Sequence, residues 1–255
     1  MTDGEVLVDA RGPVGWITFS NPAKRNALSG PMFGAALAAI EKLDGDASVR
    51  VIALRGADGT FVSGADLGGL SGAAGHRDTA GPRILEQVER VGKPVVALLE
   101  GWCLGGGVVL ALAADLRIGT PGLKFGIPAA RLGAAYPLDA VAALVRTGGQ
   151  SVAAQLLLSG QPIDGRRAYQ VGLLNWLFDE PEFETKAAGV LATLAAGAPL
   201  TLLASKRAIA AAFDGPGGEK SDAAAAAAAA CWKSTDFREG REAFLAKRAP
   251  RFSGT

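Results

Sequence analysis

The stretch that decides the fold reads Lys93-Pro-Val-Val-Ala-Leu-Leu-Glu-Gly-Trp-Cys-Leu-Gly-Gly-Gly107 and runs into Val108-Val-Leu-Ala-Leu-Ala-Ala-Asp-Leu-Arg117. Its first apolar run predicts a buried strand, and the glycines before the second run predict a turn that opens a helix. The first N–H groups of a helix lack partners within the helix, and the positive end of its dipole lies there. Because glycines let a ligand approach the backbone, this turn suits an anion or a developing oxyanion. The alternative is that the glycines only allow tight packing of helix and strand.

A second glycine-containing segment, Gly59-Thr-Phe-Val-Ser-Gly-Ala-Asp-Leu67, lies before this turn in the sequence. Neither segment fits a nucleotide-binding motif. Leu110 stands where the dinucleotide fingerprint requires its third glycine, and Ala65 stands where a P-loop requires lysine.

The flanking sequence predicts a repeated order of strand, strand and helix. We expect strands at 6–9, 16–19, 49–55, 94–99 and 116–118, and helices from Ser29, at 84–91 and at 105–113. From Pro137 onward helices predominate, and the alanine run 223–230 predicts one more. This order indicates a layered α/β core followed by a helical region.

Composition excludes several classes of protein. The 255 residues include 26 Lys+Arg and 25 Asp+Glu, so no net basic charge indicates nucleic-acid binding. No apolar run reaches the length of a membrane span, and the start lacks the pattern of a signal peptide. Two cysteines without a CxxC or HExxH motif predict neither a disulfide framework nor a metal site. We therefore expect a cytoplasmic protein without nucleic-acid or membrane partners.

A set of motifs spread over nearly the whole chain resembles, in order and spacing, the enoyl-CoA hydratase/isomerase (crotonase) family. The motifs are Asn21-Pro, Asn26-Ala-Leu28, Phe61-Val-Ser-Gly-Ala-Asp-Leu67, Lys93-Pro-Val-Val, Gly101-Trp-Cys-Leu-Gly-Gly-Gly107, Phe125-Gly-Ile-Pro, Arg131-Leu-Gly133, Ser159-Gly, Ala168-Tyr-Gln-Val-Gly-Leu173 and the tail 236–252. The resemblance implies a crotonase-like (ClpP/crotonase) spiral of repeated ββα units. It places a crotonase-type α/β core at 1–195 and a C-terminal helical trimerisation region at 196–255. The expected assembly is a homotrimer or a hexamer.

The resemblance also implies a site for an acyl-CoA thioester. The backbone N–H groups of Ala65 and Gly106 would form an oxyanion hole for the thioester oxygen. No cofactor is implied, since coenzyme A enters as part of the substrate. The residues expected to bind the substrate are Lys24, Arg25, Ser63, Asp66, Leu67, Trp102, Gly105 and Lys247.

Each of these substrate contacts has a defined expected place. Ser63, Asp66 and Leu67 would curl around the adenine end of coenzyme A, and Trp102 would line the acyl tunnel. Lys24 and Arg25 would lie near the entrance, with solvated surface charge as the alternative. Lys247 would meet coenzyme A phosphates, with a neighbouring subunit as one source of that contact.

Two positions depart from the pattern of a hydratase. Hydration of a 2-enoyl thioester needs two carboxylates, one to activate water and one to deliver the α-proton. In family hydratases these are glutamates at the positions that Val109 and Ala129 occupy here. Neither side chain transfers a proton, so the resemblance supports the fold and the oxyanion hole but not hydration.

Three polar residues remain as candidates for chemistry. Tyr136 resembles in position the active-site tyrosine of the family's methylmalonyl-CoA decarboxylases, with simple ring packing as the alternative. Asp139 is a candidate acid or base, or caps a helix start through Arg146. Glu100, at a strand end, has a structural role as its alternative. The only histidine, His76, lies beside the glycine-rich loop 68–75 and has a possible role in a lid.

The functions left open follow from these residues. The first is an acyl-CoA enzyme that stabilises a thioester enolate during hydration, isomerisation or decarboxylation. The alternatives are a decarboxylase of the methylmalonyl-CoA type and an acyl-CoA binding protein without catalytic activity.

Overall fold

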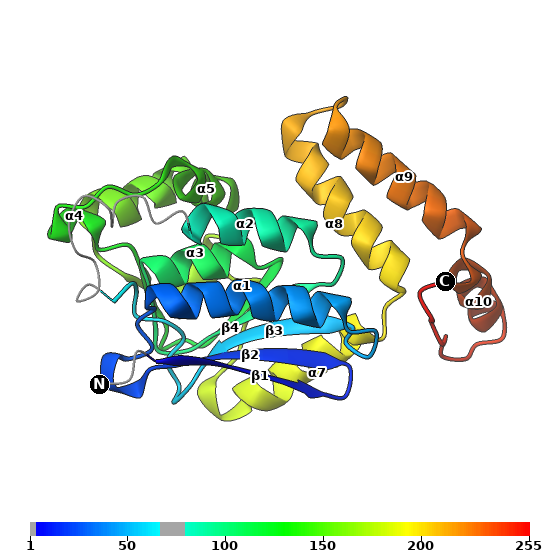
Figure 1. The fold of residues 1–255 in the computed structure, drawn as a ribbon, viewed down its shortest axis with the longest axis horizontal. Helices are drawn as coiled ribbons and strands as arrows, with labels where there is room; N and C mark the ends of the chain where they lie inside the picture. Colours follow the sequence, from blue (N-terminus) through cyan, green and yellow to red (C-terminus); the bar gives the residue numbers. More distant parts are fainter. Residues whose placement is uncertain (1–3, 67–79) are drawn as a thin grey trace.

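The computed structural model describes residues 4–66 and 80–255, and its main sheet has six strands in the order β1-β2-β3-β4-β6-β9 (Figure 1). The strands are β1 (Glu5–Arg11), β2 (Val14–Ser20), β3 (Val51–Gly56), β4 (Val95–Leu99), β6 (Leu116–Gly119) and β9 (Trp176–Leu177). The hairpin β1–β2 is antiparallel and every later pairing is parallel. The strands expected from sequence are therefore confirmed.

A second, smaller sheet is formed by strands that alternate along the chain with those of the first. It contains β5 (Trp102–Leu104), β7 (Lys124–Gly126) and β8 (Ile163–Asp164) in the order β5-β7-β8. Each of β5 and β7 directly follows a strand of the main sheet and precedes a helix. This is the repeated ββα unit of a crotonase-like fold.

Helices cover both faces of the main sheet. On one face lie α1 (Gly30–Gly45), α2 (Ala80–Arg90) and α3 (Gly106–Ala113), and on the other lies α7 (Phe183–Ala195). Val95, Ala97 and Leu99 of β4 pack in the first core, whereas Val96 and Leu98 pack in the second. A parallel strand covered on both faces is apolar at nearly every position, which explains the continuous apolar run at 95–99.

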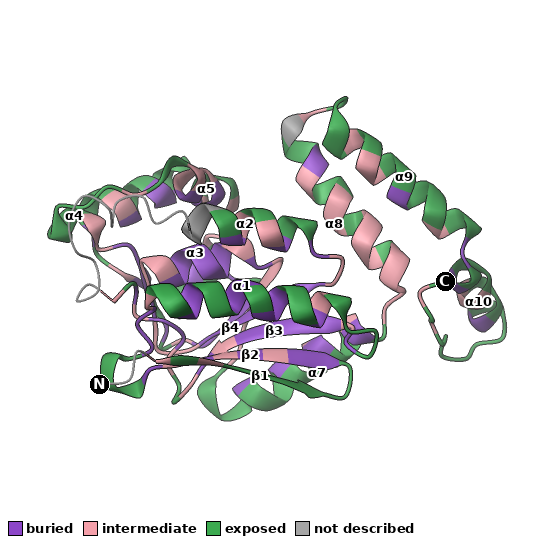
Figure 2. Cartoon of the chain, viewed as in Figure 1, coloured by how far each residue is buried: buried purple, intermediate pink, exposed green. Residues whose placement is uncertain are grey.

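The helix α3 lies in the interior. Its residues Gly107–Leu112 are all buried (Figure 2). Because α3 is buried, its first turn is held in place beside Val62 of the second glycine segment.

The remaining helices form the rest of the body and a C-terminal arm. They are α4 (Ala129–Leu132), α5 (Leu138–Ser159), α6 (Gly165–Gln170), α8 (Pro199–Asp214), α9 (Glu219–Lys233) and α10 (Thr235–Leu245), with short 3₁₀ helices at Pro22–Lys24 and Glu180–Glu182. In Figure 1, α8, α9 and α10 extend away from the sheet. The alanine run lies within α9, which begins at Glu219, one turn before the first alanine.

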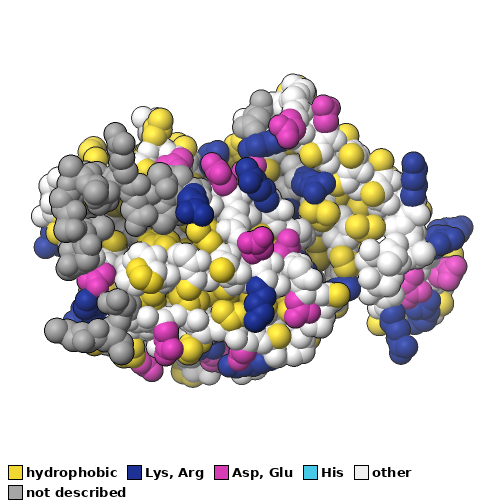
Figure 3. All heavy atoms as spheres, viewed as in Figure 1, with side chains coloured by type: hydrophobic (Ala, Val, Ile, Leu, Met, Phe, Trp, Pro, Cys, Tyr) yellow, Lys and Arg dark blue, Asp and Glu magenta, His cyan; other side chains and the backbone are white. Residues whose placement is uncertain are grey.

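The arm carries exposed apolar side chains. Figure 3 shows hydrophobic groups gathered over α8 and α9. Ile209, Phe213 and Trp232 are each more than half exposed, at 65%, 63% and 70%. In the described part of the chain no single helix is long and apolar enough to cross a membrane, although the bent pair Glu180–Ala195 and Pro199–Phe213 meets those criteria when both helices are taken together.

The packing of α3 predicts which glycine of the triplet is needed for stability. A Cβ added to Gly107 would lie 2.6 Å from the Val62 carbonyl oxygen, so Gly107→Ala forces helix and loop apart. We expect this change to lower the free energy of unfolding by about 1–3 kcal/mol, measured by urea denaturation. Gly34→Ala in α1 is the matched control, because nothing lies within 4 Å of its added Cβ. It should raise stability by roughly 0.5–1 kcal/mol, and equal effects of the two changes would contradict the packing argument.

Candidate functional site

The two glycine segments lie side by side because their backbones are hydrogen-bonded. Val62 donates its N–H to the Trp102 carbonyl at 2.9 Å, and Leu104 donates to the Val62 carbonyl at 2.9 Å. Phe61 donates to the Glu100 carbonyl, also at 2.9 Å. The segment at 61–66 thus runs beside β5 and arrives at the start of α3.

Leu28 fixes the far end of the same segment. It donates its N–H to the Gly64 carbonyl at 2.8 Å and accepts the N–H of Asp66 at 2.8 Å. In such a parallel bridge the intervening Ala65 directs its own N–H away from the partner strand. Within residues 4–66 and 80–255, this N–H has no hydrogen-bond partner.

Gly106 brings a second N–H group to the same place. As the first residue of α3, it has an N–H without a partner in the helix, and the described residues supply none from elsewhere. A Cβ built on Gly106 would lie 3.7 Å from the Ala65 nitrogen. Two backbone N–H groups from different loops, both without a partner among the described residues, therefore lie near each other.

Gly105 sets the direction of this turn. Its φ of 49° and ψ of −113° lie outside the range that side-chain-bearing residues adopt readily. Its N–H donates to the Gly126 carbonyl of β7 at 3.0 Å. Its carbonyl accepts the N–H groups of Val108 and Val109, at 2.9 and 3.3 Å, and the hydroxyl of Tyr136 at 2.5 Å.

Tyr136 is thus a hydrogen-bond donor to the backbone of the glycine turn, and its ring packs against the main core. Burial raises the pKa of Tyr136 well above its ordinary value, and the neighbouring Cys103 adds to the shift. Burial likewise raises the pKa of the Cys103 thiol, so this cysteine is neutral and a poor nucleophile. Both groups stay protonated at neutral pH.

Five of the residues expected to bind substrate lie together at the edge of the two loops. Lys24 forms an ion pair with Asp66 at 2.5 Å, and the Ser63 hydroxyl donates to the Lys24 carbonyl at 2.9 Å. The Arg25 guanidinium lies 5.8 Å from the centre of the Trp102 ring. The Arg25 guanidinium thus lies over the Trp102 ring, and Lys24 is paired with Asp66.

Two buried asparagines hold this edge in place, a role that sequence reasoning missed. Asn26 donates its amide to the carbonyls of Ala57 and Thr60, at 2.9 and 2.7 Å. Its amide oxygen accepts the N–H of Asn21 at 2.9 Å. Both residues belong to motifs quoted above. The carbonyl partners of Asn26 lie more than 30 residues away in the chain, so the sequence carries no direct signal of these contacts.

The positions of the absent carboxylates lie at the start of two helices. Val109 is buried in the first turn of α3, and Ala129 is half-buried as the first residue of α4. The Asp139 carboxylate accepts the N–H of Ala140 at 2.9 Å at the start of α5. Its expected link to Arg146 is absent from the hydrogen bonds and ion pairs of the described residues.

Glu100 lies on the opposite face of the sheet from the glycine turn. It follows Leu98 of the second core by two residues, and its electrostatic neighbours are Glu184, Arg55 and Glu180. Burial, and then repulsion by Glu184, raise the pKa of Glu100. This placement favours its structural reading over an acid/base role.

Other expected residues lie elsewhere. Lys247 comes two residues after the end of α10, and Figure 1 shows α10 well separated from α3, so a single chain does not bring Lys247 to the start of α3. Leu67, His76 and the glycine-rich loop 68–75 lie outside the described residues.

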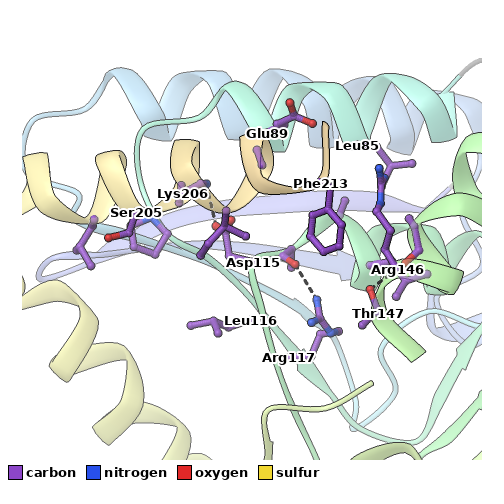
Figure 4. Close-up of a pocket in the computed structure, with 18 of the residues that line it drawn as sticks. Leu85, Glu89, Asp115, Leu116, Arg117, Arg146, Thr147, Ser205, Lys206 and Phe213 are labelled. Atoms are coloured by element: carbon purple, nitrogen blue, oxygen red, sulfur yellow. Dashed lines mark hydrogen bonds and ion pairs between the residues drawn. The ribbon is translucent and has the colours of Figure 1, made fainter. Parts of the chain in front are cut away.

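A separate cavity of about 480 Å³ lies between α8 and the layer of α2, α3 and α5 (Figure 4). On its wall Lys206 of α8 pairs with Asp115 at 2.8 Å, and Asp115 accepts the N–H of Val95 at 2.7 Å. Asp115 follows the end of α3, so the cavity is remote from the first turn of that helix. Its polar groups anchor the arm to the body.

Comparison with known proteins agrees with this architecture. A model of the enoyl-CoA hydratase/isomerase family matches residues 9–255. A probable enoyl-CoA hydratase of Bacillus subtilis is 32% identical over 246 residues, covering 93% of this chain and 94% of the relative. The 2,3-dehydroadipyl-CoA hydratase of Escherichia coli is 30% identical over 98% of this chain and 99% of its own length. The crystal structure of an enoyl-CoA hydratase/carnithine racemase from Magnetospirillum magneticum superposes with a TM-score of 0.91 at 30% identity, covering 100% of this chain and 97% of that one.

The raised pKa of Glu100 predicts a pH-dependent stability effect. The folded-state pKa of Glu100 lies above the ordinary value of 4.5, so ionisation of this carboxyl destabilises the fold. The free energy of unfolding is therefore undiminished below about pH 4.5 and falls as the pH rises through the folded-state pKa. Glu100→Gln should therefore be more stable than the wild type at pH 7, by no more than about 1 kcal/mol because water screens a half-buried group. The difference should vanish near pH 4 in thermal unfolding. Glu41→Gln, at an exposed position of α1, is the control, and an equal gain there would contradict the prediction.

Proposed function

The chain belongs to the enoyl-CoA hydratase/isomerase family, and from this we propose that it binds an acyl-CoA thioester and stabilises the enolate of that thioester with backbone N–H groups. The donors are those of Ala65 and Gly106. The observation that carries the proposal is their meeting as partnerless N–H groups from two loops that are hydrogen-bonded to each other.

The two N–H groups would stabilise the transition state because negative charge develops on the oxygen beside them. When a proton or a carboxyl group leaves the α-carbon, negative charge moves onto the thioester oxygen. A preorganised donor at that oxygen contributes about 3–4 kcal/mol of transition-state stabilisation. The buried helix α3 keeps the Gly106 donor fixed, so little reorganisation accompanies the reaction.

The side chains around the turn argue against efficient hydration. Val109 and Ala129 supply no carboxylate, Glu100 lies across the sheet, and Asp139 is bonded to its own helix. Although the curated relatives are named hydratases, we propose that water addition by this chain is slow.

A second candidate reaction is decarboxylation of a malonyl-type thioester. The C–C bond to the carboxylate breaks, CO₂ leaves, and the electron pair becomes the enolate whose oxygen the two N–H groups hold. A proton from water then restores the α-carbon. The absence of carboxylates at 109 and 129 favours this step, because it needs no general base. Binding of thioesters without any turnover would instead indicate a non-catalytic acyl-CoA binding protein.

The C-terminal arm is the second element of the proposal, with a role in assembly and in coenzyme A binding. We propose that the chain assembles as a homotrimer or hexamer and that Lys247 contacts coenzyme A phosphates bound to a neighbouring subunit. The exposed Ile209, Phe213 and Trp232 support an assembly, since large exposed apolar side chains favour burial in an interface.

Introducing the missing carboxylates tests the proposal for hydration. The double variant Val109→Glu, Ala129→Glu should hydrate crotonyl-CoA at least about 10²-fold faster than the wild type, because it regains an acid/base pair. Loss of absorbance of the conjugated thioester measures the rate. The variant Val109→Gln, Ala129→Gln is the matched control for size and polarity. Wild-type hydration at ordinary enzyme rates would show that the two positions have been misread.

Removing one backbone donor tests the oxyanion site. Ala65→Pro deletes an N–H that has no partner in the described structure, whereas Ala65→Gly keeps it. We expect the wild type to release CO₂ from malonyl-, methylmalonyl- or ethylmalonyl-CoA, and Ala65→Pro to lower that rate by about 10²–10³-fold. Ala65→Gly should remain close to the wild type. Recovery of all three thioesters intact from the wild type would end the decarboxylase candidate.

A further inference from the structure

The Tyr136 hydroxyl and the Gly106 N–H act on the same peptide unit. The hydroxyl donates to the Gly105 carbonyl at 2.5 Å, and that carbonyl and the Gly106 N–H belong to one planar amide. In a trans amide the two groups point in opposite directions. Fixing the carbonyl therefore fixes the line along which the N–H points.

A hydrogen bond to the carbonyl also changes the strength of the N–H donor. Donation to the oxygen polarises the amide and makes its N–H a better donor, by about 10–30% for each bond. The effect is larger where the local dielectric is low, and the half-buried Tyr136 packs its ring against the core.

Among the described residues that donate to the Gly105 carbonyl, Tyr136 is the one that lies outside α3. The N–H groups of Val108 and Val109 also reach the Gly105 carbonyl, but they belong to the helix that the amide opens. Tyr136 comes from the segment between α4 and α5, and Gly126 of β7 holds the Gly105 N–H. Two elements other than the helix thus set the orientation of the turn.

We propose that Tyr136 is a positioning residue that orients and strengthens the Gly106 N–H through the Gly105–Gly106 amide, and does not itself act on the substrate. The inference rests on the proposed function, because it assigns a reason for the strength of one of the two donors. It differs from the expectation from sequence that Tyr136 is a candidate for chemistry at the substrate, since its hydroxyl proton is donated to the Gly105 carbonyl.

The experiment reads the polarisation of a bound carbonyl without requiring turnover. The probe is butyryl-CoA labelled with ¹³C at the thioester carbon, which has neither a double bond to hydrate nor a carboxyl group to lose. In the wild type, binding should move its ¹³C resonance downfield. In Tyr136→Phe this displacement should fall by at least about 10–30%, while the dissociation constant changes by less than about threefold.

The chain offers matched controls, because it contains only two tyrosines. Tyr169→Phe, at a 48% exposed position of α6, should leave the displacement unchanged. In the Tyr169→Phe background, 3-fluorotyrosine incorporation alters Tyr136 alone. The more acidic phenol is a stronger donor and should increase the displacement. This second measurement retains the hydroxyl and therefore does not depend on the stability of Tyr136→Phe.

The outcomes separate the two proposals. A normal displacement in the wild type that Tyr136→Phe and fluorotyrosine both leave unchanged would overturn the positioning role alone. A fall in turnover of Tyr136→Phe with an unchanged carbonyl resonance would also overturn it, because the hydroxyl would then act on the substrate directly. A wild-type complex without any displacement would overturn the proposed function, and this inference with it.

Discussion

The pairing of the segment at 61–66 with β5 is the constraint on which the site depends. Two hydrogen bonds between Val62 and the backbone of Trp102 and Leu104 align segments that lie about 40 residues apart in the chain. Leu28 closes the other side of Ala65, and Gly107 allows α3 to approach Val62 without a side chain between them. Backbone contacts alone therefore bring two free donors together, before any functional side chain is considered.

The entrance of the site is fixed by a different kind of contact. The buried amide of Asn26 ties the loop after β2 to the turn after β3, and this places Lys24 beside Asp66 and Arg25 above Trp102. Buried polar groups are tolerated only when they are hydrogen-bonded, so the loop has one favourable conformation. Its cations are consequently presented in a defined arrangement beside the glycine turn.

Local patterns in the sequence were sufficient for five strands of the main sheet and for α1, α2 and α3, but they did not predict the short strands β5, β7, β8 and β9. The approach of the two glycine segments was implied only by the family resemblance. Apolar runs at 51–54 and 95–99, the N-cap Ser29 and the glycine triplet each have a local physical meaning, and the structure confirms the elements they predict. The partners of Tyr136, Glu100 and Asn26 could not be predicted, because those contacts depend on tertiary packing and not on spacing. The face to which Glu100 points follows only from the register of β4 within the sheet. The bend of α5 at Gly149, where φ is 81°, was also invisible to a helical pattern that continues on both sides.

The free donors of Ala65 and Gly106 have a consequence for how this scaffold can change. A main-chain N–H is present whatever side chain a codon specifies, and only proline removes it. In the proposed function, substitutions at 109 and 129 therefore change the acid/base groups while both N–H donors remain. In the proposed function, a chain without both acids thus keeps its two N–H donors for chemistry that needs no base.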